Sequence, residues 1–202
     1  GDDATRTGLR VGDPVLGIFR IGGRGSHQAW KHMRAQGGGV RQEMLVHMID
    51  LASWCLGAPE RVDRLAERLL RPDRTINGLE VKVDAEDYTV VRLVTHAGAE
   101  VLIEADLLTP SFSQHVEVQG TNGSFFGSIQ ANKPQYLELQ SARGGFQSGR
   151  TDLSPNGDDP FGRQMRAFAE AIDGGNPVGF AGFEDSLHTS LALEQLGAPA
   201  AS

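Results

Sequence analysis

Residues 37–57 read GGGVRQEMLVHMIDLASWCLG, and this stretch decides how the fold is interpreted. Three glycines precede a segment that is apolar at most positions. The segment ends at Gly57, with Pro59 just beyond it, as helices commonly do. Its apolar residues cannot all lie on one stripe, and a helix that is apolar on almost every side is typically a buried one. We therefore predict a buried helix that starts at the glycine run.

Four side chains interrupt this apolar segment at spacings of four, three and four residues. They are Glu43, His47, Asp50 and Trp54. Residues at these spacings lie along one narrow face of a helix. Ionisable side chains are rarely buried unless they are paired or functional. The stripe therefore indicates either an internal hydrogen-bond network or the wall of a functional site.

The spacing of Glu43 and His47 lets their side chains meet across one helical turn. A carboxylate beside an imidazole orients the ring and favours its charged form, which suits a proton-transfer site near neutral pH. A satisfied internal network is the alternative, since buried polar groups are usually just paired. A metal site is a third interpretation. The residues match no standard zinc spacing, and we predict no metal.

A basic cluster lies just before the predicted helix. Between Asp13 and Glu43 the chain has no acidic residue but five basic ones: Arg20, Arg24, Lys31, Arg34 and Arg41. Such a cluster is usually a solvated face. The functional alternative is a pocket rim for an anionic group, either a carboxylate or a cofactor phosphate delivered by another domain.

Composition narrows the class of protein. The net charge of −7 over 202 residues argues against a nucleic-acid-binding protein. No apolar run is long enough to span a bilayer, so we expect no membrane partner. Cys55 is the only cysteine, which makes an intrachain disulfide impossible, and we expect a reducing cytoplasm. The chain also has no G-x-G-x-x-G, P-loop or G-x-S-x-G motif, so it shows no dinucleotide-binding unit of its own.

The hydrophobic pattern predicts a run of strands followed by helices. The predicted strands cover residues 15–21, 60–70, 88–95, 100–107, 115–119, 124–129 and 136–140, and residues 141–158 form a loop or weak edge strand. Helices follow from residue 160 to the glycines at 174–175 and over residues 184–196. This order indicates an α+β fold with a large, mainly antiparallel open sheet and helices on one face. We treat residues 1–202 as a single domain.

The segment GGGVRQEMLVHMIDLASWCLGAPERV resembles the start of the C-terminal domain of the Gfo/Idh/MocA oxidoreductases, which include glucose–fructose oxidoreductase and inositol dehydrogenases. That family's usual pattern is a glycine run, a D-x-x-x-H pair, H-x-x-D, and an end of the form W/L-x-x-G-x-P. The later segments LRVGDPVLGIF, HVEVQGTNGSF, FGRQMRAFAEAIDGGNPV and FEDSLHTSLALEQL resemble its first strand, its strand–GT-x-G–strand hairpin and its last two helices. The resemblance covers essentially the whole chain.

The resemblance implies that this chain is the substrate-binding half of an NAD(P)-dependent dehydrogenase or reductase for a sugar, cyclitol or similar polyol. The family's N-terminal Rossmann domain carries NAD or NADP and an E-K-P lysine, neither of which is present here. No cofactor is therefore expected on this chain alone. The family's open sheet face commonly forms the dimer interface, so the resemblance also implies a homodimer or tetramer.

The resemblance assigns catalytic roles to His47 and Glu43. His47 matches the histidine that exchanges a proton with the substrate hydroxyl, and Glu43 stands where the family usually has aspartate. Asp50 matches the family's following aspartate, a position with a structural role. Among the substrate-binding residues we predict Asp50, Lys31, Trp30 and Arg20. The alternative is a non-catalytic binding or dimerisation module, which the change from aspartate to glutamate motivates.

Overall fold

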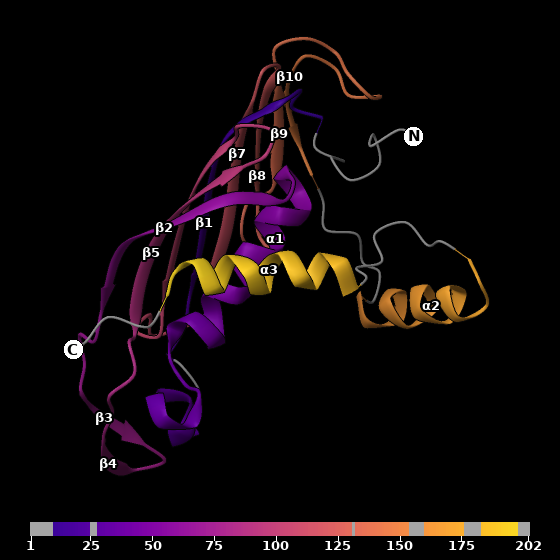
Figure 1. Cartoon of the computed structure of the whole chain (residues 1–202). Helices are drawn as coiled ribbons and strands as arrows, with labels where there is room; N and C mark the ends of the chain where they lie inside the picture. The colour runs from indigo at the N-terminus through magenta and orange to yellow at the C-terminus, as the bar shows by residue number, and fades with distance from the viewer. Residues whose placement is uncertain (1–9, 25–27, 131, 154–159, 176–182, 198–202) are drawn as a thin grey trace.

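The computed structural model describes residues 10–24, 28–130, 132–153, 160–175 and 183–197. Within these residues one large sheet dominates, and α1 (Val46–Leu56) and α3 (Phe183–Gln195) lie on the same side of it (Figure 1). A third helix, α2 (Pro160–Ile172), lies beyond the end of α3 (Figure 1). The predicted α+β class with helices on one face of the sheet is confirmed.

Eight strands of the described chain form the large sheet. They are β1 (Pro14–Gly22), β2 (Pro59–Arg68), β5 (Tyr88–Thr95), β6 (Glu100–Asp106), β7 (Ser113–Gly120), β8 (Gly123–Gly127), β9 (Tyr136–Leu139) and β10 (Gly149–Asp152). Their order across the sheet is β10-β9-β8-β7-β1-β6-β5-β2. Only the β1–β6 pair is parallel among these strands, so the prediction of a mainly antiparallel sheet holds.

Alternation along the central strands separates a covered face from an open face. In β6, Val101 and Ile103 are buried while Leu102 is 40% exposed. In β1, Phe19 is buried while Ile18 is 37% exposed. Alternate residues of a strand point to opposite faces, so Phe19, Val101 and Ile103 face the helices. The core lies between this covered face and the inner sides of α1 and α3.

A short hairpin that the hydrophobic pattern did not predict projects from one end of the sheet. It consists of β3 (Asp73–Ile76) and β4 (Leu79–Lys82), joined by Asn77 and Gly78 with φ angles of 53° and 79°. Positive φ at both turn residues is the geometry that an Asn-Gly hairpin turn favours. The hairpin has its own two-stranded sheet and does not extend the large one.

The described residues contain no helix long and apolar enough to cross a membrane.

Asp106 is buried at the end of β6, although its strand position predicts the solvated face. Its carboxylate accepts hydrogen bonds from the amides of Leu108 and Thr109, from the Thr109 hydroxyl and from the Arg20 guanidinium. Burial alone would raise the pKa of Asp106, but these hydrogen bonds and the charge of Arg20 outweigh it and lower that pKa. Asp106 thus fastens the loop between β6 and β7.

Asp106→Asn should therefore lower the free energy of unfolding at pH 7 by about 1–3 kcal/mol. A lowered folded-state pKa contributes stability above the unfolded pKa and loses it as pH falls through the folded pKa. The difference between wild type and variant should accordingly shrink in acid. Urea unfolding at neutral and acidic pH measures it, with Glu60→Gln on exposed β2 as control. A loss that is equal at both pH values would contradict the assignment.

Candidate functional site

The glycine run is packed against two other chain segments. The amide of Gly39 donates to the carbonyl of Lys31 at 2.9 Å, and a side chain at Gly38 would clash with that same carbonyl. Gly39 has a φ of +121°, and a Cβ there would clash with the carboxyl group of Glu86. The run is therefore filled by the chain itself, so the described residues offer no cradle there for the pyrophosphate of a dinucleotide.

The helix that follows is continuous over residues 41–56, and we call it the site helix. Its first turn, η3 (Arg41–Leu45), is π-helical, because the amide of Val46 donates to the carbonyl of Arg41 five residues earlier. The rest is α1. A π-turn adds one residue to a helical turn and often occurs at functional sites. Glu43 lies in this turn and His47 in regular α-helix, so their spacing does not describe a plain α-helical face.

The prediction of a helix buried on all sides is wrong. Ile49 and Ala52 are fully buried against the sheet, but His47 and Asp50 are exposed and Trp54 is 46% exposed. The polar stripe is therefore not an internal network. It lies along the outer side of the site helix, where no other part of the described chain covers His47.

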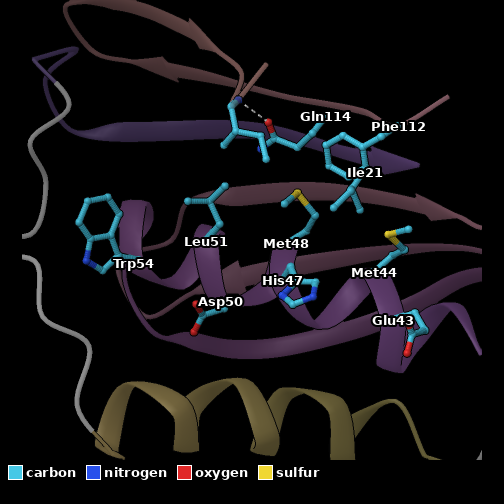
Figure 2. Close-up of a pocket in the computed structure, with 11 residues that line it drawn as sticks. Ile21, Glu43, Met44, His47, Met48, Asp50, Leu51, Trp54, Phe112 and Gln114 are labelled. Carbon is cyan, nitrogen blue, oxygen red and sulfur yellow. Dashed lines mark hydrogen bonds between the residues drawn. The ribbon is translucent and has the colours of Figure 1, made fainter. Parts of the chain in front are cut away.

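Part of the helix's remaining apolar surface lines a pocket with a volume of about 680 Å³. Figure 2 shows its lining, which combines the site helix with β1, the loop before β7, β7 and the segment after β8: Ile21, Glu43, Met44, His47, Met48, Asp50, Leu51, Trp54, Phe112, Gln114 and Ile129. Met44, Met48 and Leu51 point from the helix toward the strands (Figure 2). The pocket thus has an apolar floor and a polar rim that includes His47.

Glu43 is paired with Lys31, and no hydrogen bond between Glu43 and His47 is observed in the described structure. The ammonium of Lys31 lies 2.7 Å from Oε2 of Glu43, and both side chains are largely buried. Lys31 also lies over the Trp30 ring, 5.3 Å from its centroid. Lys31 comes from η1 (Ala29–His32), which the glycine run holds beside the site helix. The structure therefore brings Trp30 and Lys31 to the Glu43 end of the pocket.

Asp50 has a partner on α3. The hydroxyl of Thr189 donates to Oδ1 of Asp50 at 3.2 Å. Asp50 also lines the pocket, so its two predicted roles, structural and substrate-binding, both have support in the geometry.

Arg20 is not brought to the pocket. Ile21, which lines the pocket, and Phe19 point to the covered face of β1, so Arg20 points to the open face. There its guanidinium donates to Asp106 and Thr109. The residue is committed to the β6–β7 loop rather than to a ligand on the helix side.

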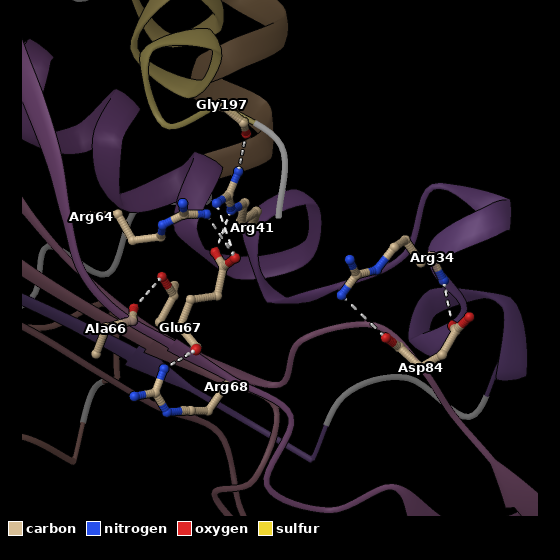
Figure 3. A network of polar contacts seen from close by, with 9 residues as sticks. Arg34, Arg41, Arg64, Ala66, Glu67, Arg68, Asp84 and Gly197 are labelled. Atoms are coloured by element: carbon tan, nitrogen blue, oxygen red, sulfur yellow. Dashed lines mark hydrogen bonds and ion pairs between the residues drawn. The ribbon is translucent and has the colours of Figure 1, made fainter. Parts of the chain in front are cut away.

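The rest of the basic cluster is also dispersed. Arg41 is buried, binds Glu67 of β2 through two nitrogens and donates to the carbonyl of Gly197 (Figure 3). Arg34 pairs with Asp84 through its amide and its guanidinium (Figure 3). The predicted anionic pocket rim therefore reduces to Lys31, whose charge Glu43 already balances.

Sequence patterns alone missed the far wall of the pocket. Phe112, Gln114 and Ile129 come from segments remote from the site helix, and an amide–carboxamide hydrogen bond joins Ile129 to Gln114 at 2.9 Å. Only the exposed apolar character of Phe112 and Ile129, at 43% and 75% exposed, distinguishes them, and exposure is not visible in a sequence. The described residues contain no group of three or more His, Cys, Asp or Glu side chains that could hold a metal ion.

A solvent-accessible imidazole on the rim of an apolar pocket can exchange a proton with a bound hydroxyl. This arrangement coincides with a family assignment. The family model described as the GFO/IDH/MocA C-terminal domain matches residues 9–126. The chain belongs to the Gfo/Idh/MocA family. The resemblance predicted from the sequence is thereby confirmed.

Solved structures share this fold at low sequence identity. The apo form of levoglucosan dehydrogenase has a TM-score of 0.73 at 16% identity, covering 93% of this chain and 57% of that one. Its complex with NADH and levoglucosan has a TM-score of 0.71 at 18% identity, covering 92% and 57%. An oxidoreductase from Agrobacterium radiobacter in complex with NAD+, L-tartaric acid and magnesium has a TM-score of 0.66 at 17% identity, covering 93% and 54%.

The chain thus spans little more than half the length of these neighbours. No protein of curated function matches it in sequence.

Cys55 tests how closely the site helix packs on the sheet. Burial raises the pKa of its thiol to about 11, two units above the model value of 9.0. The thiolate fraction at pH 8 should therefore be about 100-fold lower than that of an unperturbed thiol. Reaction with a chromogenic disulfide reagent should be slow in the native protein and fast in urea. Native reactivity equal to that of N-acetylcysteine would show that the helix is not packed as described.

Proposed function

We propose that this chain is the substrate-binding and proton-exchanging domain of an NAD(P)-dependent oxidoreductase that acts on a sugar, cyclitol or similar polyol. The observation that carries the proposal is the exposed imidazole of His47 on the rim of the pocket. Membership of the family and the NADH or NAD+ in its structural neighbours support it. An upstream Rossmann domain would hold the dinucleotide, which supplies the hydride chemistry, because the glycine run here leaves no room for it.

The residues of this chain would divide the work as follows. His47 accepts the proton of the substrate hydroxyl during oxidation and returns it during reduction. Met44, Met48 and Leu51 form an apolar floor that excludes water. Glu43, held ionised by the neighbouring ammonium of Lys31, accepts a hydrogen bond from a second hydroxyl. A polyol offers both hydroxyls and apolar C–H surface, which suits such a pocket.

A non-catalytic binding or dimerisation module is the second candidate. One observation favours it: Glu43 is bound to Lys31, which leaves His47 without a described carboxylate partner to orient its ring. Turnover in the longer protein separates the two candidates. As compartment we propose the cytoplasm, because the single cysteine Cys55 cannot form an intrachain disulfide.

His47→Ala should lower kcat/KM by about 10²- to 10⁴-fold, the range that general acid–base groups contribute. The assay uses a protein that carries this chain behind a cofactor-binding domain, and follows NADH formation across a panel of sugars and cyclitols. His96→Ala is the matched control, since His96 is an exposed histidine in the β5–β6 turn. Unchanged turnover in His47→Ala would remove His47 from the mechanism.

We further propose that the open face of the sheet joins two copies of the chain. Leu16, Ile18 and Leu102 are 37–40% exposed at the centre of this face, on adjacent strands. Charges of both signs flank them, because Arg92 pairs with Glu100 and Asp63. An apolar centre bordered by both signs of charge is self-complementary across a two-fold axis.

Ile18→Lys should shift the protein from dimer to monomer, because it places a charge at the centre of the apolar patch. Sedimentation equilibrium measures the change in mass. Leu79→Lys is the control, since Leu79 is 69% exposed on the separate β3–β4 hairpin. A wild-type monomer, or a dimer that survives Ile18→Lys, would exclude this interface.

A further inference from the structure

Glu86 lies beneath the first turn of the site helix, although it belongs to the loop before β5. It is 3% exposed. Its backbone carbonyl accepts from the amide of Val40 at 2.9 Å, and its carboxylate accepts a hydrogen bond from the amide of Arg41. The first amides of a helix have no partner within the helix, so Glu86 caps the site helix from another part of the chain. Gly39 lacks a side chain where that carboxyl group lies.

The burial of this carboxylate is costly. Its Oε2 atom is buried and has no hydrogen-bond partner. Burial raises the pKa of Glu86, and the charge of Glu67 acts in the same direction, whereas the amide hydrogen bonds and Arg41 oppose them. An apolar or neutral residue would avoid much of this penalty. A buried carboxylate with one unsatisfied oxygen therefore needs an explanation beyond packing.

Arg41 connects this cap to the rest of the fold. Glu86 binds its backbone amide, and Glu67 and the carbonyl of Gly197 bind its side chain (Figure 3). Arg41 is also the first residue of the π-turn, whose closing hydrogen bond uses its carbonyl. The residue that starts the π-turn is thus fixed at its amide, its carbonyl and its guanidinium.

The π-turn decides where Glu43 points. It adds one residue between the capped end and the regular helix, so it changes the direction of Glu43 relative to His47. In the structure Glu43 meets Lys31, while His47 faces the pocket without it. A helix that relaxed to regular α geometry would place Glu43 and His47 on one face, one turn apart.

We propose that Glu86 is a positioning residue: by capping Arg41 it maintains the π-turn that directs Glu43 to Lys31 and leaves the His47 imidazole free for the ligand. The inference rests on the proposed function of the pocket, but its geometric part does not need turnover. Glu86 itself touches no ligand, because Gly39 and the site helix lie between it and the pocket.

The experiment compares Glu86→Ala with Glu86→Gln, which keeps a side-chain oxygen for the Arg41 amide. NMR spectra of the 202-residue chain follow the His47 ring, the Glu43 carboxyl carbon and the Lys31 side-chain amine at one fixed pH. In Glu86→Ala all three signals should move by more than a line width, and in Glu86→Gln they should stay near their wild-type positions. Methyl signals of Leu93 and Ile103 in the sheet should not move in either variant.

Asp84→Asn is the matched control, because Asp84 lies in the same loop and binds Arg34 rather than the site helix. If Glu86→Ala does not fold, Glu86→Asp takes its place, since the shorter side chain withdraws the carboxylate from Arg41. A variant that melts at lower temperature while the His47 and Glu43 signals stay in place would overturn the proposal, because the role would then be structural only.

In the longer, active protein, Glu86→Ala should lower kcat about 10- to 100-fold, as misplacement of about 1 Å can do, with a smaller change in KM. Glu86→Gln should restore most of kcat. The two proposals fail separately. Unchanged turnover in His47→Ala would refute the proposed function, whereas unmoved NMR signals in Glu86→Ala would refute the positioning role.

Discussion

The buried ion pair between Arg41 and Glu67 determines where the site helix begins relative to the sheet. Arg41 is at the helix start and Glu67 is on β2, and both side chains are at most 5% exposed. Removing one partner of such a pair leaves an uncompensated buried charge, which typically costs about 3–5 kcal/mol. Because the same arginine also binds Gly197 at the end of α3, the pair joins sheet, site helix and C-terminal helix at one point.

This anchoring explains why the site helix can be open on one side. Ile49 and Ala52 hold the helix on the sheet by apolar burial, and Asp50 binds Thr189 of α3. The opposite edge is then free to present His47 over the pocket. Rigid support beneath an exposed functional side chain is what a proton-exchanging residue needs, because small displacements of a reacting group are costly in rate.

Much of the fold followed from the sequence because strand alternation is a local property. Val101 and Ile103 alternate with Leu102, and this pattern predicted β6 and its covered face to within one residue. The same logic places Arg20 on the open face, since it lies between Phe19 and Ile21. The sequence analysis considered Arg20 only as a member of a basic cluster, so it assigned the residue to the substrate.

The details of the site depend on tertiary contacts that spacing does not show. Glu43 and His47 stand four residues apart, which suggests contact only if the helix is regular. The π-turn depends on Arg41 and on Glu86, whose sequence neighbours give no sign that it caps a helix. Lys31 reaches Glu43 because the glycine run allows η1 to pack there. The partner of Glu43 was therefore set by three segments at once.

A crystal structure of the longer protein with bound NADH and a polyol from the active panel tests the central claim most directly. The account predicts that one substrate hydroxyl lies within hydrogen-bond distance of a His47 nitrogen, about 2.6–3.2 Å, with the nicotinamide ring facing the same carbon from the opposite domain. A substrate bound away from the pocket lined by Met44, Met48 and Leu51, or a nicotinamide ring that does not face it, would contradict the account.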